Sequence, residues 1–447
     1  MTNSLYFCMD NICAMDISVL YELFLRHPQV TTDSRDCPPG SLFFALKGES
    51  FNGNKFATHA LDAGCAVAVV DEEDCVVPGD ERFFLVDDCL HALQQLANHH
   101  RRKLGTPIIA VTGTNGKTTT KELISAVLMR KFNVLYTQGN YNNHIGVPKT
   151  LLRLTPEHEL AVVEMGANHP GEIRDLARIV EPDYGIITNV GMAHLEGFGS
   201  FEGVLRTKGE LYESLRTRSD SRLFIHRDNP HLNGIAYGLQ QVAYGKTSDA
   251  ADMVNGEVVE CAPYVAFRWR IGQGEWHQVE SHLIGSYNLD NMLAAAAIGV
   301  FFGVDSQQID DALAGYIPQN NRSQLTVTAS NHLIVDAYNA NPTSMMAALR
   351  NFREMKVEHK FVLLGDMREL GAVSEEEHQK VVDFLERCCF EQVWLVGAEF
   401  AKSRHSFRSF ANVDEVNAAL DNEHPSGFYI LVKGSNGIRL FNAIPHL

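Results

Sequence analysis

Residues 112–120 read Thr112-Gly113-Thr114-Asn115-Gly116-Lys117-Thr118-Thr119-Thr120. An apolar β-branched run at residues 108–111 precedes this glycine-rich stretch, and a segment with helical apolar spacing at residues 121–128 follows it. In the order strand, loop, helix, successive backbone N–H groups and a helix N-terminus point at one place, which suits an anion. The stretch is therefore predicted to be a phosphate-binding loop, with ATP as its nucleotide.

Two side chains of this loop have expected tasks: Lys117 contacts the outer phosphates, and Thr118 binds Mg²⁺ through its hydroxyl. The common pattern G-x-x-x-x-G-K-[ST] would place a glycine where this chain has Val111, so the first glycine comes two residues late, at Gly113. The alternative is a glycine-rich turn that only caps a helix. The required order of strand, loop, Lys and Thr favours the nucleotide loop.

Composition and charge exclude several classes of protein. The chain has 447 residues, of which 45% are hydrophobic and 21% charged, as in globular proteins of about three domains. Its net charge of −17, without a basic cluster among aromatics, excludes a nucleic-acid partner. No apolar run could cross a bilayer and no signal peptide is evident, so we expect no membrane insertion and a cytoplasmic location. Nine cysteines, never spaced C-x-x-C, predict neither disulfides nor a zinc site.

The pattern of strands and helices predicts an α/β protein of three domains. Residues 1–86 are expected to form a small α/β domain, and residues 87–317 a central domain whose alternating strands and helices imply a mostly parallel sheet. Short alternating segments at residues 222–284 predict an antiparallel subsheet within it. Residues 318–447 resume the alternation, which predicts a doubly wound, Rossmann-like domain.

In a doubly wound sheet, ligands bind at the carboxyl ends of the strands. Three strands of the last domain run into polar or glycine-containing turns: Asp336, Gly365-Asp366 and Lys433-Gly434-Ser435. These turns are expected to line a cleft.

Two further side chains follow predicted strand ends, Glu164 directly and His194 after a short loop. Either residue alone would be interpreted as a capping carboxylate or a structural loop histidine. Because both share the rim of the sheet with Thr118, we expect them to complete ligand shells for one or two hard cations.

Lys208 is placed by its sequence context at the start of a helix, a position that the helix dipole makes unfavourable for a cation. An exposed surface lysine is the simplest interpretation. Alternatively, its free amine reacts with CO₂ and becomes a carbamate that binds a metal ion.

Taken together, these motifs resemble the ATP-dependent Mur ligases over nearly the whole chain. The resemblance rests on the phosphate loop, the Asn-Val-Gly-x-x-His pattern at residues 189–194, Lys208, the helix start at residues 285–291 and Asp336. Residues 32–35, 42–48, 336–344 and 365–371 resemble the member that adds a dipeptide. The sibling that adds the third peptide residue carries D-Y-A-H-x-P where this chain has D-A-Y-N-A-N-P, and its D-N-P-R element is not found.

The resemblance implies an acid–D-amino-acid ligase that joins D-alanyl-D-alanine to UDP-N-acetylmuramoyl-tripeptide through an acyl phosphate, in peptidoglycan precursor synthesis. The first domain would bind the UDP substrate, the central domain ATP and two Mg²⁺ ions, and the third domain the dipeptide. It assigns nucleotide binding to Gly113, Thr114, Asn115, Gly116, Lys117, Thr118, Thr119, Asn288, Asn291, Arg322 and Asp336. It assigns substrate binding to Ser34, Arg35, Lys47, Tyr338, Asn339 and Asn341. It assigns metal binding to Thr118, Glu164, His194 and a carbamylated Lys208, and catalysis to Lys117, Glu164, His194 and Lys208.

The chain departs from the family pattern at three places. Relatives often have His where this chain has Tyr287 and Gly where it has Asn321, and the family's K-G-S-R reads Lys433-Gly434-Ser435-Asn436, so Asn436 is given no role. Two alternatives stay open: a sibling amide ligase of the UDP-N-acetylmuramoyl-dipeptide or folyl-polyglutamate type, and a catalytically silent nucleotide-binding relative. We expect a monomer.

Overall fold

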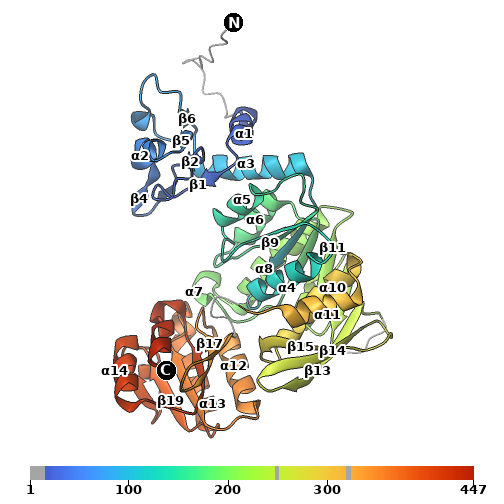
Figure 1. Cartoon of the computed structure of the whole chain (residues 1–447), viewed down its shortest axis with the longest axis vertical. Helices are drawn as coiled ribbons and strands as arrows, with labels where there is room; N and C mark the ends of the chain where they lie inside the picture. The colour runs from blue at the N-terminus through green and yellow to red at the C-terminus, as the bar shows by residue number, and fades with distance from the viewer. Residues whose placement is uncertain (1–15, 247–250, 319–323) are drawn as a thin grey trace. The chain divides into compact units, whose positions relative to one another are not determined.

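The computed structural model describes residues 16–246, 251–318 and 324–447 (Figure 1). They belong to two compact units. The first unit draws on residues 1–106 and 141–158, and the second on residues 107–140 and 159–447.

The first unit is built on a parallel four-stranded sheet in the order β1-β2-β5-β6. Its strands are β1 (Val30–Thr31), β2 (Leu42–Phe44), β5 (Val67–Val70) and β6 (Phe83–Leu85), with a small hairpin of β3 (Lys47–Gly48) and β4 (Phe51–Asn52). Its helices are α1 (Ile17–Arg26), α2 (Ala57–Asp62), α3 (Cys89–Leu104) and α5 (Gly146–Leu151).

The long helix α3 begins after Asp88, whose side chain accepts a hydrogen bond from the His91 N–H, and ends at Gly105 with φ +69°. The boundary expected at residue 86 assigned α3 to the central domain. Its apolar face instead packs on α1 and α5, so α3 is part of the first unit.

The second unit contains a nine-stranded sheet in the order β15-β14-β13-β12-β11-β10-β7-β9-β8. Its strands are β7 (Ile108–Thr112), β8 (Val134–Tyr136), β9 (Leu160–Glu164), β10 (Tyr184–Ile187), β11 (Arg222–His226), β12 (Gln241–Gly245), β13 (Val254–Cys261), β14 (Tyr264–Ile271) and β15 (His277–Ile284). The helices around it are α4 (Lys117–Leu128), α6 (Glu172–Val180), α7 (Leu195–Phe198), α8 (Phe201–Arg216), α9 (Pro230–Ile235), α10 (Asn288–Phe301) and α11 (Ser306–Gly315).

The antiparallel subsheet exists but is smaller than the sequence predicted. Strands β13, β14 and β15 pair antiparallel, whereas β11 and β12 pair parallel with their neighbours, so the prediction was wrong for them. Since α9 crosses over between β11 and β12, these two strands continue the alternating pattern.

The position of Lys208 also differs from the expectation. Ser200 caps α8 by accepting a hydrogen bond from the Gly203 N–H, and the helix begins at Phe201. Lys208 therefore lies in the interior of α8, because the capping signal stands further upstream than the sequence analysis placed it.

A six-stranded sheet, in the order β16-β17-β21-β18-β19-β20, completes the second unit. Its strands are β16 (Gln324–Val327), β17 (His332–Asp336), β18 (Lys360–Gly365), β19 (Gln392–Val396), β20 (Arg408–Phe410) and β21 (Tyr429–Lys433), and its helices are α12 (Pro342–Glu354), α13 (Ser374–Glu386) and α14 (Val413–Glu423). All its pairs are parallel except β16 with β17.

Both faces of this sheet are covered. In β18, Val362 and Leu364 pack into one apolar cluster, while Phe361 and Leu363 pack into another on the opposite face. Helices α12 and α13 supply the first cluster and α14 the second, as Figure 1 also shows by their placement around β17 and β19. The doubly wound arrangement is confirmed.

The helices and the cysteines of the described ranges bear on membrane insertion and on disulfides. None of the helices there combines the length and apolar character needed to cross a bilayer. The seven cysteines in the described ranges are free thiols.

Candidate active site

The glycine-rich loop connects the end of β7 to the start of α4 at Lys117, in the predicted order. Its two glycines have positive φ, +142° at Gly113 and +75° at Gly116. The Lys117 side chain folds back across the loop, and its Nζ donates to the carbonyl oxygens of Gly113 (2.8 Å) and Thr114 (2.9 Å). The ammonium group is thus held over the space that the loop encloses.

The segment after β10 fixes the shape of the loop. The Thr188 hydroxyl (2.6 Å) and the Asn189 amide (3.0 Å) both donate to the Asn115 carbonyl oxygen, and the Asn115 N–H donates to Asn189 Oδ1 (3.0 Å). A Cβ atom on Gly113 would lie 2.1 Å from Thr188 Oγ1. Close approach therefore demands a glycine at 113, while Val111, where the common pattern has one, is a fully buried strand residue.

A hydroxyl and a carboxylate meet beneath the loop. Thr118 Oγ1 donates to Glu164 Oε1 at 3.2 Å, and both residues are buried. Glu164 is brought there by strand pairing, since it lies opposite Val111 in the register of β9 with β7. Oxygen ligands of this kind fit Mg²⁺, which keeps further ligands from phosphates and water. The described ranges contain no group of three or more His, Cys, Asp or Glu that could hold a metal ion.

Lys208 is one of the largest fully buried side chains, and only 2% of it is exposed. Its Nζ donates to the Ala167 carbonyl oxygen (3.1 Å) and lies 5.3 Å from the centre of the Phe198 ring. Burial, and secondly the charge of Lys117, lower the pKa of Lys208 well below its ordinary value. This environment favours the neutral amine, the form that reacts with CO₂.

His194 stands at the N-terminus of α7 with φ +51°, and its Nδ1 contacts the carboxylate of Glu369, in the loop after β18. Burial lowers the pKa of His194, the Glu369 carboxylate opposes this shift, and the charge of Lys117 adds to it. The charges of Lys117 and Lys208 both act on the imidazole, so these three predicted residues lie in one electrostatic environment.

The six-stranded sheet also contributes to the phosphate loop. Asn341 caps α12 by accepting the Ser344 N–H (2.9 Å), and its amide donates to Asn115 Oδ1 (2.8 Å). Thr343, two residues further along, adds a second contact, in which the Met192 N–H donates to its Oγ1 (3.2 Å). Thr343 and these contacts were not predicted, although Asn before Pro is a helix-start signal that marks the position.

The two asparagines expected at adenine face each other at the start of α10. Asn291 Oδ1 accepts the Thr120 hydroxyl (3.0 Å), the Asn291 amide donates to Asn288 Oδ1 (2.8 Å), and the Asn288 amide donates to the Ile284 carbonyl oxygen (2.8 Å). A Cβ on Gly116 would lie 2.7 Å from Asn291 Oδ1. In this structure the pair joins α10 to the phosphate loop, and an adenine contact stays a prediction.

The remaining predicted residues of the second unit lie at the carboxyl end of β17. Asp336 Oδ2 forms an ion pair with the buried Lys433 Nζ at 2.5 Å. Tyr338 is half-buried and Asn339 is exposed in the turn that follows. Arg322 and Asn321 lie outside the described residues.

The predicted substrate-binding residues of the first unit either form ion pairs with neighbouring carboxylates or are buried. Exposed Arg35 pairs with Asp33 (2.8 Å), and Lys47 pairs with Asp71 (2.9 Å) and Glu72 (3.1 Å). Ser34, between the first pair, is buried. Their role in binding a substrate stays a prediction.

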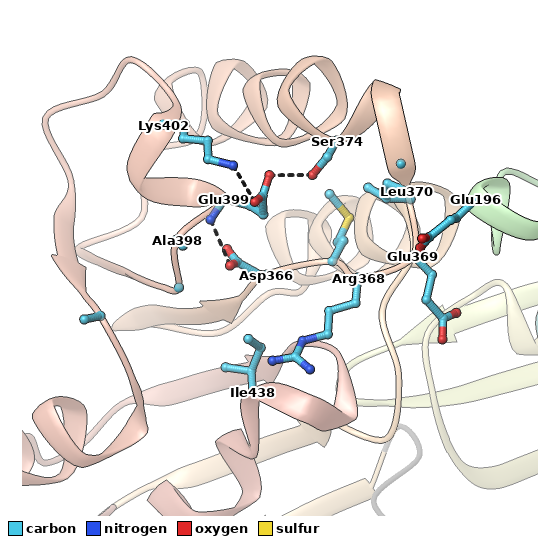
Figure 2. Close-up of a pocket in the computed structure, with 14 residues that line it drawn as sticks. Glu196, Asp366, Arg368, Glu369, Leu370, Ser374, Ala398, Glu399, Lys402 and Ile438 are labelled. Atoms are coloured by element: carbon cyan, nitrogen blue, oxygen red, sulfur yellow. Dashed lines mark hydrogen bonds and ion pairs between the residues drawn. The ribbon is translucent and has the colours of Figure 1, made fainter. Parts of the chain in front are cut away.

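The cleft expected at the strand ends of the six-stranded sheet is present in part. A cavity of about 810 Å³ is lined by Asp366 after β18 and by residues after β19 (Figure 2). Asp336 and residues 433–435 do not line it.

Comparison with known proteins agrees with this architecture. Three family models match the chain: the Mur ligase family, catalytic domain, at residues 28–101; the Mur ligase middle domain at residues 111–299; and the Mur ligase, glutamate ligase domain at residues 321–436. A relative from Bacillus subtilis (strain 168) is 35% identical over 96% of this chain and 94% of its own length, and is named UDP-N-acetylmuramoyl-tripeptide–D-alanyl-D-alanine ligase.

Two solved structures are similar along nearly their whole length. MurF from Acinetobacter baumannii has a TM-score of 0.85 at 31% identity and covers 93% of this chain and 92% of its own. MurF ligase from Thermotoga maritima in complex with ADP has a TM-score of 0.83 over 95% of this chain and 97% of its own; at 24% identity it supports the fold alone. On the family models and the 35% identity over nearly the full chain, the chain belongs to the Mur ligase family.

Proposed function

We propose that this protein is an ATP-dependent amide ligase that joins D-alanyl-D-alanine to UDP-N-acetylmuramoyl-tripeptide, giving the pentapeptide, ADP and phosphate. One structural observation carries the proposal: at the phosphate loop, Lys117 Nζ donates to the Gly113 carbonyl oxygen and the buried Thr118 hydroxyl donates to Glu164. The name carried by the Bacillus subtilis relative, 35% identical over nearly the whole chain, supports the dipeptide-adding reaction over that of a sibling ligase.

ATP is needed because a carboxylate is a poor electrophile and the amine partner is protonated in water. The tripeptide carboxylate attacks the γ-phosphorus, the bond to the β,γ-bridging oxygen breaks, and ADP leaves with that electron pair. Lys117, which here donates to two loop carbonyls, is placed to donate to the transferring phosphoryl group. Mg²⁺ bound at Thr118 and Glu164 would neutralise charge that develops on the phosphate oxygens.

The second step is attack of the free amine of the dipeptide on the acyl phosphate. A tetrahedral intermediate forms, the carbon–oxygen bond to phosphate breaks, and the amine proton is lost to a base. Because water would compete with the amine, the site must exclude it. The contacts of Asn341 with Asn115 and of Thr343 with Met192 bring the six-stranded sheet against the loop, which serves that purpose.

In the proposed active site, the amine of Lys208 has reacted with CO₂ and is a carbamate. Its burial disfavours the ammonium ion, and conversion of the amine to an anion would place negative charge near the second predicted metal ligand, His194. Two Mg²⁺ ions, one at Thr118 and Glu164 and one at His194 and Lys208, complete the proposed site.

We assign one ligand to each part of the chain: the first unit binds the UDP substrate, the nine-stranded sheet with its helices binds ATP, and the six-stranded sheet with its helices binds the dipeptide. The cytoplasmic location and the monomeric state expected from the sequence remain part of the proposal.

A substrate panel tests the function. Phosphate release is measured with ATP while the acceptor is either UDP-N-acetylmuramoyl-dipeptide or UDP-N-acetylmuramoyl-tripeptide, and the amine is either D-alanyl-D-alanine or a single amino acid, glutamate included. We expect release only with the dipeptide. Release with a single amino acid would indicate a sibling ligase, and tight ATP binding without release with any UDP-muramyl peptide would indicate a silent relative.

A further inference from the structure

The cavity at the carboxyl ends of β18 and β19 has no assigned role. Its volume of about 810 Å³ is within the usual range for a small-molecule site. Its charged side chains come from the loops after those two strands and, in the case of Glu196, from α7 of the nine-stranded sheet (Figure 2). The cavity therefore lies where the two sheets of the second unit meet, beside His194.

Most of the charges in the cavity are already paired within the protein. Glu399 accepts hydrogen bonds from Lys402 Nζ (2.6 Å) and from the Ser374 hydroxyl (2.8 Å). Asp366 accepts the N–H groups of Glu399 and Phe400, both at 2.9 Å. Figure 2 draws the contacts that join Glu399 to Lys402, Ser374 and Asp366. Both carboxylates are therefore already hydrogen-bonded within the wall of the cavity.

The carboxylate of Glu369 also has a partner within the protein, because it contacts the His194 ring. Among the described residues that line the cavity, the charged side chains left without a hydrogen bond or ion pair are Arg368 and Glu196. The cavity therefore presents one unpaired cation and one unpaired anion.

Arg368 is nonetheless held in place. Its backbone N–H donates to the Ser435 hydroxyl (2.8 Å). Its guanidinium lies against Gly437, where a Cβ atom would come within 2.3 Å of Nη1. Figure 2 shows Arg368 and Glu369 extending in different directions from the same loop, with the guanidinium toward Ile438. Gly437 directly follows Asn436, the position at which the family pattern K-G-S-R has its arginine.

The net charge of the side chains that line the cavity indicates which class of ligand it can bind. Four carboxylates, on Glu196, Asp366, Glu369 and Glu399, face two cations, on Arg368 and Lys402. A phosphate or a dicarboxylate would be repelled by this excess of negative charge. A zwitterion matches the two unpaired groups, since a guanidinium binds a carboxylate in bidentate fashion and a carboxylate attracts an ammonium.

We propose that Arg368 binds the C-terminal carboxylate of the incoming dipeptide and that Glu196 attracts its amino end; this assignment rests on the proposed function. The orientation follows from the origin of the two residues. Glu196 belongs to α7, which begins after His194, so the amino end is directed toward the phosphate loop. Arg368 then selects for a free carboxylate at the far end of the dipeptide.

Calorimetric binding tests the site without relying on turnover. The full-length wild type is titrated with D-alanyl-D-alanine and with its C-terminal amide, and the titrations are repeated for Arg368→Ala and Arg368→Lys. We expect the wild type to prefer the acid over the amide by roughly 10- to 100-fold, as for a charge-assisted hydrogen bond, and Arg368→Ala to bind both equally. Arg368→Lys should keep part of the preference.

Lys402→Met is the matched control, because Lys402 lines the same cavity but is paired with Glu399. It should keep the acid-over-amide preference. The assignment is overturned if Arg368→Ala retains the wild-type preference, or if the wild type has none. If the wild type shows an Arg368-dependent preference but no phosphate release in the substrate panel, the cavity assignment stands and the proposed function fails.

Discussion

Replacement of Gly113 by alanine is expected to lower the stability of the protein more than replacement of a glycine in a turn usually does. At φ +142° an L-residue is strained by about 1–3 kcal/mol. The new Cβ would also lie 2.1 Å from Thr188 Oγ1 and 3.0 Å from the Thr188 backbone nitrogen. Relief of this overlap must push β10 away from the loop, at a further cost of about 1–3 kcal/mol. The expected loss of stability is therefore roughly 2–6 kcal/mol.

Gly238→Ala is the matched control within the second unit. Gly238 has a similarly unfavourable φ of +72°, but a Cβ there would meet nothing within 4 Å, so only the backbone strain of about 1–2 kcal/mol remains. Urea unfolding can be followed by tryptophan fluorescence, because all three tryptophans, Trp269, Trp276 and Trp394, lie in the second unit.

The overlap also predicts a functional loss. Displacement of Thr188 would break its 2.6 Å hydrogen bond to Asn115, and the loop N–H groups would lose their alignment, so ATP affinity should fall roughly 10- to 100-fold. Gly238→Ala should bind ATP like the wild type. Equal unfolding midpoints for the two variants, together with unchanged ATP binding in Gly113→Ala, would refute the argument from close approach.

Three further perturbations have defined outcomes. Since the pKa of Lys208 is lowered on folding from its ordinary 10.5, the unfolded chain binds more protons between the two values, and stability should rise with pH there by up to about 1.4 kcal/mol per unit. Lys208→Met should lack this contribution in urea titrations at pH 7.5 and 9 without metal or CO₂; an identical pH slope in both proteins would disprove it. Asn341→Ala should lose about 0.5–2 kcal/mol of stability as a cap and also weaken ATP binding, whereas Asn412→Ala, which removes the cap of α14, should lose stability alone; equal ATP binding in both would exclude a role in the loop. Glu164→Gln should raise the Mg²⁺ concentration for half-maximal phosphate release about 10-fold or more, and an unchanged requirement would remove Glu164 from the cation site.

The parts of the fold that could be predicted are those encoded by local patterns. The strand, loop and helix around Lys117 follow one another in the chain, and the alternation of strands and helices in residues 318–447 predicted the doubly wound sheet, whose strand β18 is covered on both faces. Glu164 could be placed near the loop because parallel strands end at the same edge of a sheet. The interior position of Lys208 in α8 was missed because the capping residue lies eight positions upstream, at Ser200.

The parts that could not be predicted depend on contacts between distant segments. Asn341 and Asn115 are 226 residues apart in sequence, and no local pattern indicates that one amide both caps a helix and contacts the phosphate loop. That Arg368 has no ion-pair partner likewise follows from tertiary packing. Only the structure shows that the neighbouring carboxylates of Glu369 and Glu399 already bind other side chains. The extent of the antiparallel subsheet depended on the short crossover helix α9, which the alternating segments around it obscured.

The central claim is that the γ-phosphate of ATP is transferred to a peptide carboxylate before the amide bond forms. The most direct test uses UDP-N-acetylmuramoyl-tripeptide labelled with ¹⁸O at both oxygens of the carboxylate that is to be joined, together with ATP and D-alanyl-D-alanine. Mass spectrometry of the products should show one ¹⁸O atom in each inorganic phosphate released and the mass of the pentapeptide product. Phosphate without ¹⁸O would contradict the account, because its fourth oxygen would then have come from water and not from the acyl phosphate.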